Sequence, residues 1–299
     1  MRKTRIAFAA ASVAALTLVL AVDVDAKTDW SPVAEVLGKK GWPGRGGTYK
    51  VTLLREEPTV KSGLGMFCPP QLGLNSYAAF AGDLEDATVV GDTCMLSHEI
   101  NPAIDALRAG GIEVVALHNH MVTDEPRLFF MHFQGRGKAL ALARTVRSAW
   151  DELGKPKPPA PKLPDGGRKT EPDWKSVSRI IREEGARVAD ATWKFSFLRD
   201  DLNIELDGRT LPAAVGLGCW AAFFACPCGL TKVMGDTCVR RSELQGVIDA
   251  LRKGGIHISA IHNHLLGTSD PLMFVHIEAE GDALAIARGV RAAWKTLGR

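Results

Sequence analysis

The chain has 299 residues, a formal net charge of +3 and a hydrophobic fraction of 46%. This length suffices for two domains that each bury a core, and the composition is ordinary for a globular protein. A nearly neutral charge without a basic patch argues against a nucleic-acid partner.

The chain begins with a pattern typical of a secretory signal peptide. A basic start at 1–5 precedes an apolar run over 6–22 and a small side chain at Ala26. The alternative is a membrane anchor, which needs about 20 apolar residues. We predict cleavage after Ala26, which removes three basic and two acidic residues and changes the net charge from +3 to +2. The mature chain would then be periplasmic or secreted, with no integral membrane span.

The rest of the chain is a tandem repeat. From Gly91 to Gly154 the sequence matches Gly235 to Gly298 without a gap, and about half of the positions are identical. Such self-similarity indicates an internal duplication. A proline-rich segment between the copies favours an extended spacer. We therefore predict a signal peptide at 1–26, a first unit at 27–154, a linker at 155–172 and a second unit at 173–299.

The two units share the same predicted elements in the same order. Short helices are expected at 30–38 and 174–184, strands at 48–55 and 192–199, and hairpins at 74–81 with 87–96 and at 217–225 with 231–240. Each hairpin precedes an amphipathic helix that ends at a Gly-Gly pair, two further strands (112–120 and around 128–133 in the first unit) and a closing helix. The Gly-Asp-Thr segments at 91–93 and 235–237 are expected to be turns capped by the Asp side chain.

This element order predicts the α+β class. We expect two tandem homologous units, each a mostly antiparallel sheet with two main helices, packed with approximate two-fold symmetry.

The segment that ends in His-Asn-His is the strongest candidate for chemistry. Alternate side chains of a strand share one face, so His118 and His120 would point the same way, as would His262 and His264. Two neutral imidazoles on one face suit a transition metal, zinc or copper. The letters do not match the HNH nuclease motif, in which the three residues are dispersed over a ββα unit.

A third histidine and a glutamate recur in both units and form a supporting ligand set. They are His132 and Glu99, matched by His276 and Glu243. A carboxylate near the start of a helix is favoured by the helix dipole. The alternative is that these residues are a polar network or packing residues that the duplication copied.

Geometry limits the role of the third histidine. If the two strands form a simple hairpin, His132 lies opposite Val115 and about 10 Å from the His118 pair, given a rise of about 3.4 Å per residue. His118 and His120 are therefore the principal predicted ligands.

Six cysteines in an exported chain favour disulfides. Cys219 and Cys238 are expected to be bridged across the second hairpin, with Cys68 and Cys94 as the analogous pair. The turn at 226–228, Cys-Pro-Cys, is expected to be a structural bridge, with a Cu(I) or dithiol site as the alternative.

Several motifs resemble the LppY/LpqO family, which is named for mycobacterial lipoproteins and has no established activity. They are Gly-Leu-Gly-Cys-Trp-Ala-Ala-Phe at 216–223, Gly-Asp-Thr-Cys, Gly-Ile-Glu-Val-Val-Ala-Leu-His-Asn-His, Glu-Pro-Arg-Leu-Phe-Phe-Met-His-Phe and the closing Leu-Ala-x-x-Val-Arg helix. The resemblance covers both units and implies an exported tandem-unit protein. The chain lacks the lipobox cysteine of the lipoprotein members, and it has cysteines where apolar residues would be expected.

Three functions follow from these observations. The first is an exported protein that binds a transition-metal ion. The second is a metal-dependent hydrolase or oxidoreductase, in which an ion with an open position activates water or oxygen. The third is an envelope module that binds a small envelope ligand between the units and has structural histidines.

Overall fold

The computed structural model describes residues 28–159, 167 and 171–298. The predicted signal peptide and most of the predicted linker lie outside the described residues. Within those residues, no helix has both the length and the apolar character that crossing a membrane requires.

Each unit follows the predicted order of elements. The first contains α1 (Ser31–Leu37), β1 (Trp42–Pro43), β2 (Tyr49–Leu54), β3 (Val60–Lys61), β4 (Phe67–Cys68), β5 (Asn75–Gly82), β6 (Ala87–Leu96), α2 (Ile100–Ala109), β7 (Glu113–His118), β8 (Leu128–Gly137) and α3 (Ala139–Trp150). The second contains α4 (Trp174–Ile181), β9 (Ala186–Ala189), β10 (Thr192–Leu198), β11 (Glu205–Leu206), β12 (Arg209–Thr210), β13 (Gly218–Ala225), β14 (Thr231–Arg240), α5 (Arg241–Lys253), β15 (His257–His262), β16 (Leu272–Gly281) and α6 (Ala283–Lys295).

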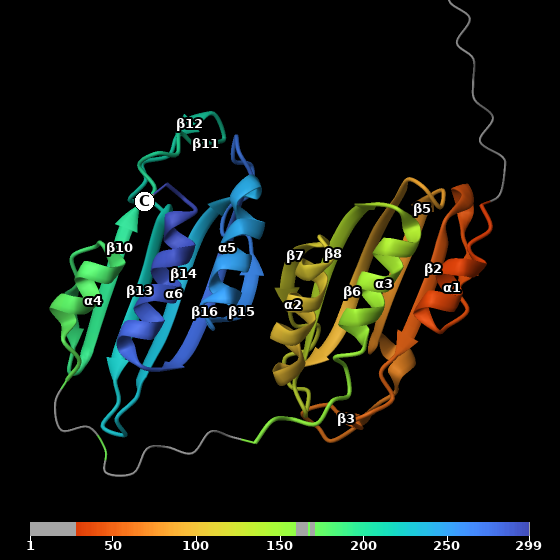
Figure 1. Ribbon diagram of the computed structural model, residues 1–299, viewed down its shortest axis with the longest axis horizontal. Coiled ribbons are helices and arrows are strands. Elements are labelled where there is room, and N and C mark those ends of the chain that lie inside the picture. Colours follow the sequence, from red (N-terminus) through yellow and green to blue (C-terminus); the bar gives the residue numbers. More distant parts are fainter. Residues whose placement is uncertain (1–27, 160–166, 168–170, 299) are drawn as a thin grey trace, which may run out of the picture.

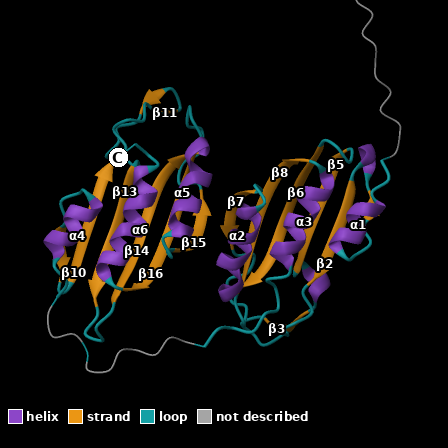
Figure 2. Ribbon diagram, in the orientation of Figure 1, coloured by secondary structure: helices purple, strands orange, loops and turns teal. Residues whose placement is uncertain are grey.

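The two units share one 12-stranded sheet. Its order is β1-β2-β5-β6-β8-β7-β15-β16-β14-β13-β10-β9. The helices of both units cover the same face of this sheet (Figures 1 and 2). The predicted α+β class, with two antiparallel units and their helices, is confirmed.

The helices form because their apolar residues recur at helical spacing and are buried on the sheet. In α2 these residues are Ile100, Ala103, Ile104 and Leu107, which are all buried. The helix ends where Gly111 takes a φ of 77°, a left-handed conformation that favours glycine. The second unit repeats this arrangement in α5.

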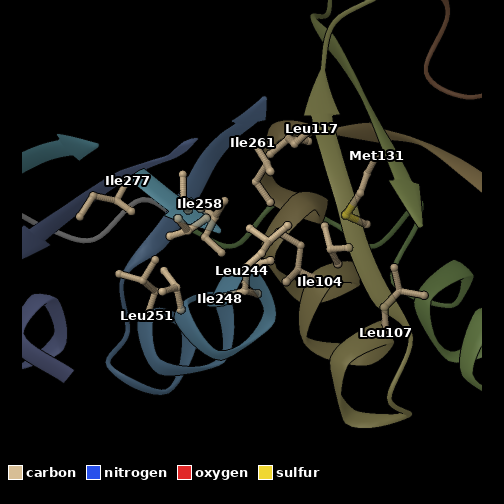
Figure 3. Close-up of a cluster of buried hydrophobic side chains, with 14 of the residues drawn as sticks. Ile104, Leu107, Leu117, Met131, Leu244, Ile248, Leu251, Ile258, Ile261 and Ile277 are labelled. Carbon is tan, nitrogen blue, oxygen red and sulfur yellow. The ribbon is translucent and has the colours of Figure 1, made fainter. Parts of the chain in front are cut away.

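An approximate two-fold axis passes between the units. Strands β7 and β15 are antiparallel, and Leu117 pairs with Ile261, its own counterpart in the repeat. An antiparallel contact between equivalent residues is what a two-fold axis produces. Figure 3 shows that Leu117 and Ile261 lie over a shared core in which α2 and α5 meet.

Polar contacts across the axis are reciprocal. Arg108 forms a bidentate ion pair with Asp249, at 2.8 and 2.9 Å. Arg252 forms the equivalent pair with Asp105, at 2.8 Å for both bonds. Each unit therefore contributes the same residues to the interface.

The predicted ligands Glu99 and Glu243 are engaged in buried ion pairs instead. Both oxygens of Glu99 accept from Arg55, at 2.6 and 2.8 Å, and both oxygens of Glu243 accept from Arg199, at 3.0 and 2.8 Å. Glu99 also accepts from the backbone N–H groups of Leu96 and Gly154, both at 2.7 Å. These carboxylates join the start of α2 to the residue after β2, and the start of α5 to the residue after β10. They are therefore not available as metal ligands.

The expected bridge at 226–228 is present, but the two predicted cross-strand pairs, Cys219 with Cys238 and Cys68 with Cys94, are not bridged. Cys226 and Cys228 form a disulfide, whereas Cys68, Cys94, Cys219 and Cys238 are free and buried. The register of β13 and β14 pairs Trp220 with Asp236, which puts Cys219 and Cys238 out of phase by one residue. Burial raises the pKa of both Cys94 and Cys238 to about 12, so these thiols stay protonated at neutral pH.

We expect Arg55→Ala to lower the free energy of unfolding by about 3–5 kcal/mol, because it leaves the buried Glu99 carboxylate without its charge partner. Urea denaturation measures this change. Arg136→Ala removes one member of an exposed ion pair with Asp86 and should change stability little. An equal loss in both variants would contradict a structural role for the Arg55–Glu99 pair.

Candidate metal centre

Three neighbouring strands bring a histidine cluster together in each unit. In the first unit β6, β8 and β7 are adjacent, and Asp92 pairs with His132, which in turn pairs with Ala116. Leu117 points into the core under the helices, so His118 points to the opposite face. The cluster therefore lies on the face of the sheet that the helices do not cover.

A β-bulge makes the third histidine part of the cluster. The pairing of β7 with β8 shifts between Val114 and Ala116, so that Ala116, not Val115, lies opposite His132. The rings of His118 and His132 are 4.8 Å apart as a result. The prediction that His132 lies about 10 Å away assumed a regular hairpin and is wrong.

The second histidine of the motif lies beyond the strand, which ends at His118 and not at residue 120 as predicted. Because His120 is not part of the strand, two contacts orient its side chain instead of the alternation of the strand. The Asn119 side chain donates to the Leu128 carbonyl at 2.6 Å, which turns the chain back toward β8. The His120 ring then stacks on Phe130 with centroids 3.4 Å apart and an interplanar angle of 9°.

The second unit repeats this geometry. The Asn263 side chain donates to the Leu272 carbonyl at 2.8 Å, and His264 stacks on Phe274 with centroids 3.6 Å apart. One nitrogen from each of His262, His264 and His276 lies within 4.8 Å of the other two. In the first unit the ring of His118 is 5.1 Å from that of His120 and 4.8 Å from that of His132.

A buried aspartate accompanies each cluster. Asp92 Oδ2 lies 3.9 Å from both His120 and His132, and Asp236 lies 3.8 Å from both His264 and His276. Both aspartates are only 5% exposed. Oδ1 of each carboxylate is buried without a hydrogen-bond partner among the described residues. A buried carboxylate oxygen without a donor is unfavourable unless a cation or donor compensates it, and this residue type suits a metal site.

Sequence reasoning missed these aspartates. The Gly-Asp-Thr segments were expected to be turns, but Asp92 and Asp236 lie inside β6 and β14. The available signal was the strand predicted at 87–96, because a turn at 91–93 does not fit inside it. Their pairing with the third histidine needed the strand order of the sheet.

The surroundings of His118, His120 and His264 favour the neutral imidazole. Burial lowers the pKa of His118, His120 and His264, and neighbouring imidazoles lower it further. The negative charges of Asp92 and Asp236 raise the pKa of His120 and of His264, respectively. Burial in turn raises the pKa of the Asp236 carboxyl. A neutral imidazole has the lone pair that a metal ion requires.

Fold and site together define a two-unit α+β protein with a cluster of three histidines and one aspartate in each unit. The chain belongs to the family described as Domain of Unknown Function (DUF1259), whose model matches residues 31–152 and 175–296. Two tandem copies of one domain are therefore present. No curated protein matches the chain.

Solved structures with some likeness to the chain are shell proteins of bacterial microcompartments. The trimeric shell protein PduB has 12% identity and a TM-score of 0.21, with 85% of this chain and 89% of that chain covered. EtuB from Clostridium kluyveri has 11% identity and a TM-score of 0.21, over 85% and 88%. The fused permuted hexameric shell protein MSM0275 has 14% identity and a TM-score of 0.18, over 87% and 97%. TM-scores this low carry no argument about this chain.

We expect His264 of the metal-free protein to titrate below the ordinary imidazole pKa of 6.5. Because the unfolded chain then binds more protons than the folded one just below pH 6.5, the metal-free fold loses stability as the pH falls through that value. Asp236→Asn should lower the His264 pKa further, since the aspartate raises it. NMR titration of the imidazole ring protons measures both effects.

Glu280→Gln is the matched control for this titration. It also removes one acid from the sheet of the second unit, on the neighbouring strand β16, but Glu280 pairs with Lys232 and not with a histidine. His264 titrating above 6.5, or responding equally to both substitutions, would contradict the proposed electrostatics.

Proposed function

We propose that the protein binds one transition-metal ion, zinc or copper, in each unit. His262, His264 and His276 are the protein ligands in the second unit, and His118, His120 and His132 are those in the first. The observation that carries the proposal is the convergence in the second unit of three histidine nitrogens to within 4.8 Å of one another, from β15, from the segment that follows it and from β16. Six of the eight histidines of the chain take part in these two clusters.

The histidine nitrogens of the second unit would have to move only slightly closer together to hold one metal ion. Tetrahedral zinc holds nitrogen at about 2.0–2.1 Å, which separates two ligand nitrogens by about 3.4 Å. Short rotations of the His262 and His276 side chains would close the remaining distance. The His264 ring is already held flat against Phe274, so it provides a fixed point of the site.

The aspartate adds a negative charge and a fourth ligand position, an oxygen, to the three imidazoles. Asp236 is buried beneath His264 and His276 and has an oxygen without a hydrogen-bond donor. It supports a dication either as a fourth ligand or as the carboxylate that orients a ligand imidazole. Three imidazoles and one carboxylate suit zinc and copper, and leave no thiolate that would select Cu(I).

We also propose that the chain is exported, is cleaved after Ala26 and belongs with the LppY/LpqO proteins within its family. The basic and apolar start of the sequence supports export. The segments ending in His-Asn-His and in Met-His support the narrower family assignment.

We expect the untagged protein to bind two zinc ions per chain and the double variant His262→Ala, His264→Ala to bind one. The double variant His118→Ala, His120→Ala should likewise bind one, because each cluster is complete within its own unit. Equilibrium dialysis followed by elemental analysis measures the stoichiometry.

His257→Ala is the matched control, since His257 lies on the same strand β15 but is exposed and pairs with Glu278. It should bind two ions, as the parent protein does. Equal metal content in the parent and both cluster variants would refute the histidine clusters as metal sites and would support a polar network instead.

A further inference from the structure

The two units differ at the buried arginine that holds the glutamate. In the second unit Arg199 is fully buried, and all three nitrogens of its guanidinium group donate hydrogen bonds. It binds Glu243 on one edge and the Cys238 carbonyl at Nη1. On its other edge Nε and Nη2 donate to the two oxygens of Asp201, at 2.9 and 2.8 Å.

In the first unit the same edge of the arginine has no carboxylate. Arg55 binds Glu99 and the Cys94 carbonyl just as its counterpart does. Its Nε–H, however, is buried without a hydrogen-bond partner among the described residues. Arg55 is 8% exposed, so bulk water does not readily compensate this donor.

A cavity of about 500 Å³ lies beside this arginine. Arg55 and Glu57 both line it, and Glu57 is the counterpart of Asp201 in the repeat. Glu57 lines the cavity, and its counterpart Asp201 binds the Nε edge of Arg199, so we assign the Nε edge of Arg55 to the cavity. A pocket of about 300–1,000 Å³ is the usual size for a small ligand.

The walls of the cavity indicate what kind of molecule fits. Leu37, Leu53 and Trp150 contribute apolar surface, Lys39 adds a cation, and Glu56 and Glu57 add carboxylates. Arg147 also lines the cavity, but its charge is already paired with Asp151 at 2.8 Å. A ligand with one carboxylate and a small apolar body would complement the Nε–H group of Arg55, the Lys39 cation and the apolar side chains.

We propose that this cavity binds a small organic carboxylate, which the Nε edge of Arg55 receives in the place that Asp201 takes in the second unit. The second unit shows that this guanidinium geometry accommodates two carboxylates at once. The first unit supplies one of them, Glu99, and the ligand supplies the other. The site lies apart from the histidine clusters and does not depend on metal binding.

The test follows the arginine Nε–H resonances by NMR during titration with acetate and phenylacetate. The Arg55 resonance, assigned with Arg55→Lys, should shift and reach saturation with at least one of these carboxylates. Acetamide and phenylacetamide, which have no charge, should not shift it. The Arg199 resonance is an internal control and should not move, because Asp201 already holds that edge.

Asp201→Ala provides a second test in the other unit. This variant should make Arg199 responsive to acetate, and acetate should raise its melting temperature more than that of the parent protein. An Arg55 resonance that responds to neither carboxylate in the parent protein would overturn the proposal, whatever the Asp201 variant does. An unchanged resonance would mean that Glu57 pairs with the Arg55 Nε–H group in solution or that the cavity excludes carboxylates.

Discussion

One extra residue in a strand determines what the histidines can do. The bulge at Val115 moves His132 into register with Ala116, and the bulge at Ser259 does the same for His276 and Ala260. Without it, the third histidine would lie one residue further along and would be out of reach of the first. A bulge leaves backbone groups poorly paired within the sheet, so other groups must satisfy them.

The interface between the units supplies those groups. The Asn101 side chain of α2 accepts from the Ile258 N–H at 2.9 Å and donates to its carbonyl at 3.4 Å. The Gln245 side chain of α5 accepts from the Val114 N–H at 3.1 Å and donates to its carbonyl at 2.8 Å. Each helix thus pairs with the backbone just before the bulge of the other unit. The two-fold packing and the histidine geometry are therefore linked through these hydrogen bonds between the units.

The sequence predicted the repeat, the order of elements and the α+β class because these follow from local periodicity and from identity between the copies. It did not predict the strand order or the bulges, and the errors at the site follow from these two features. Asp92 was assigned to a turn because its partner His132 is forty residues away in sequence. Glu99 was assigned to the metal because the sequence does not show that Arg55 reaches it from an earlier strand. Non-local pairing decided each case.

The two units agree at the histidine clusters and differ at the buried arginine. At the histidine clusters the copies agree residue for residue, down to the phenylalanine on which one imidazole stacks. At the buried arginine they diverge, because Asp201 satisfies in the second unit a donor edge that faces a cavity in the first. In the second unit Arg199 is therefore fully paired, with Glu243 on one edge and Asp201 on the other. Where the equivalent side chain does not reach, as with Glu57, the same buried donor becomes an anchor for a carboxylate from outside the chain.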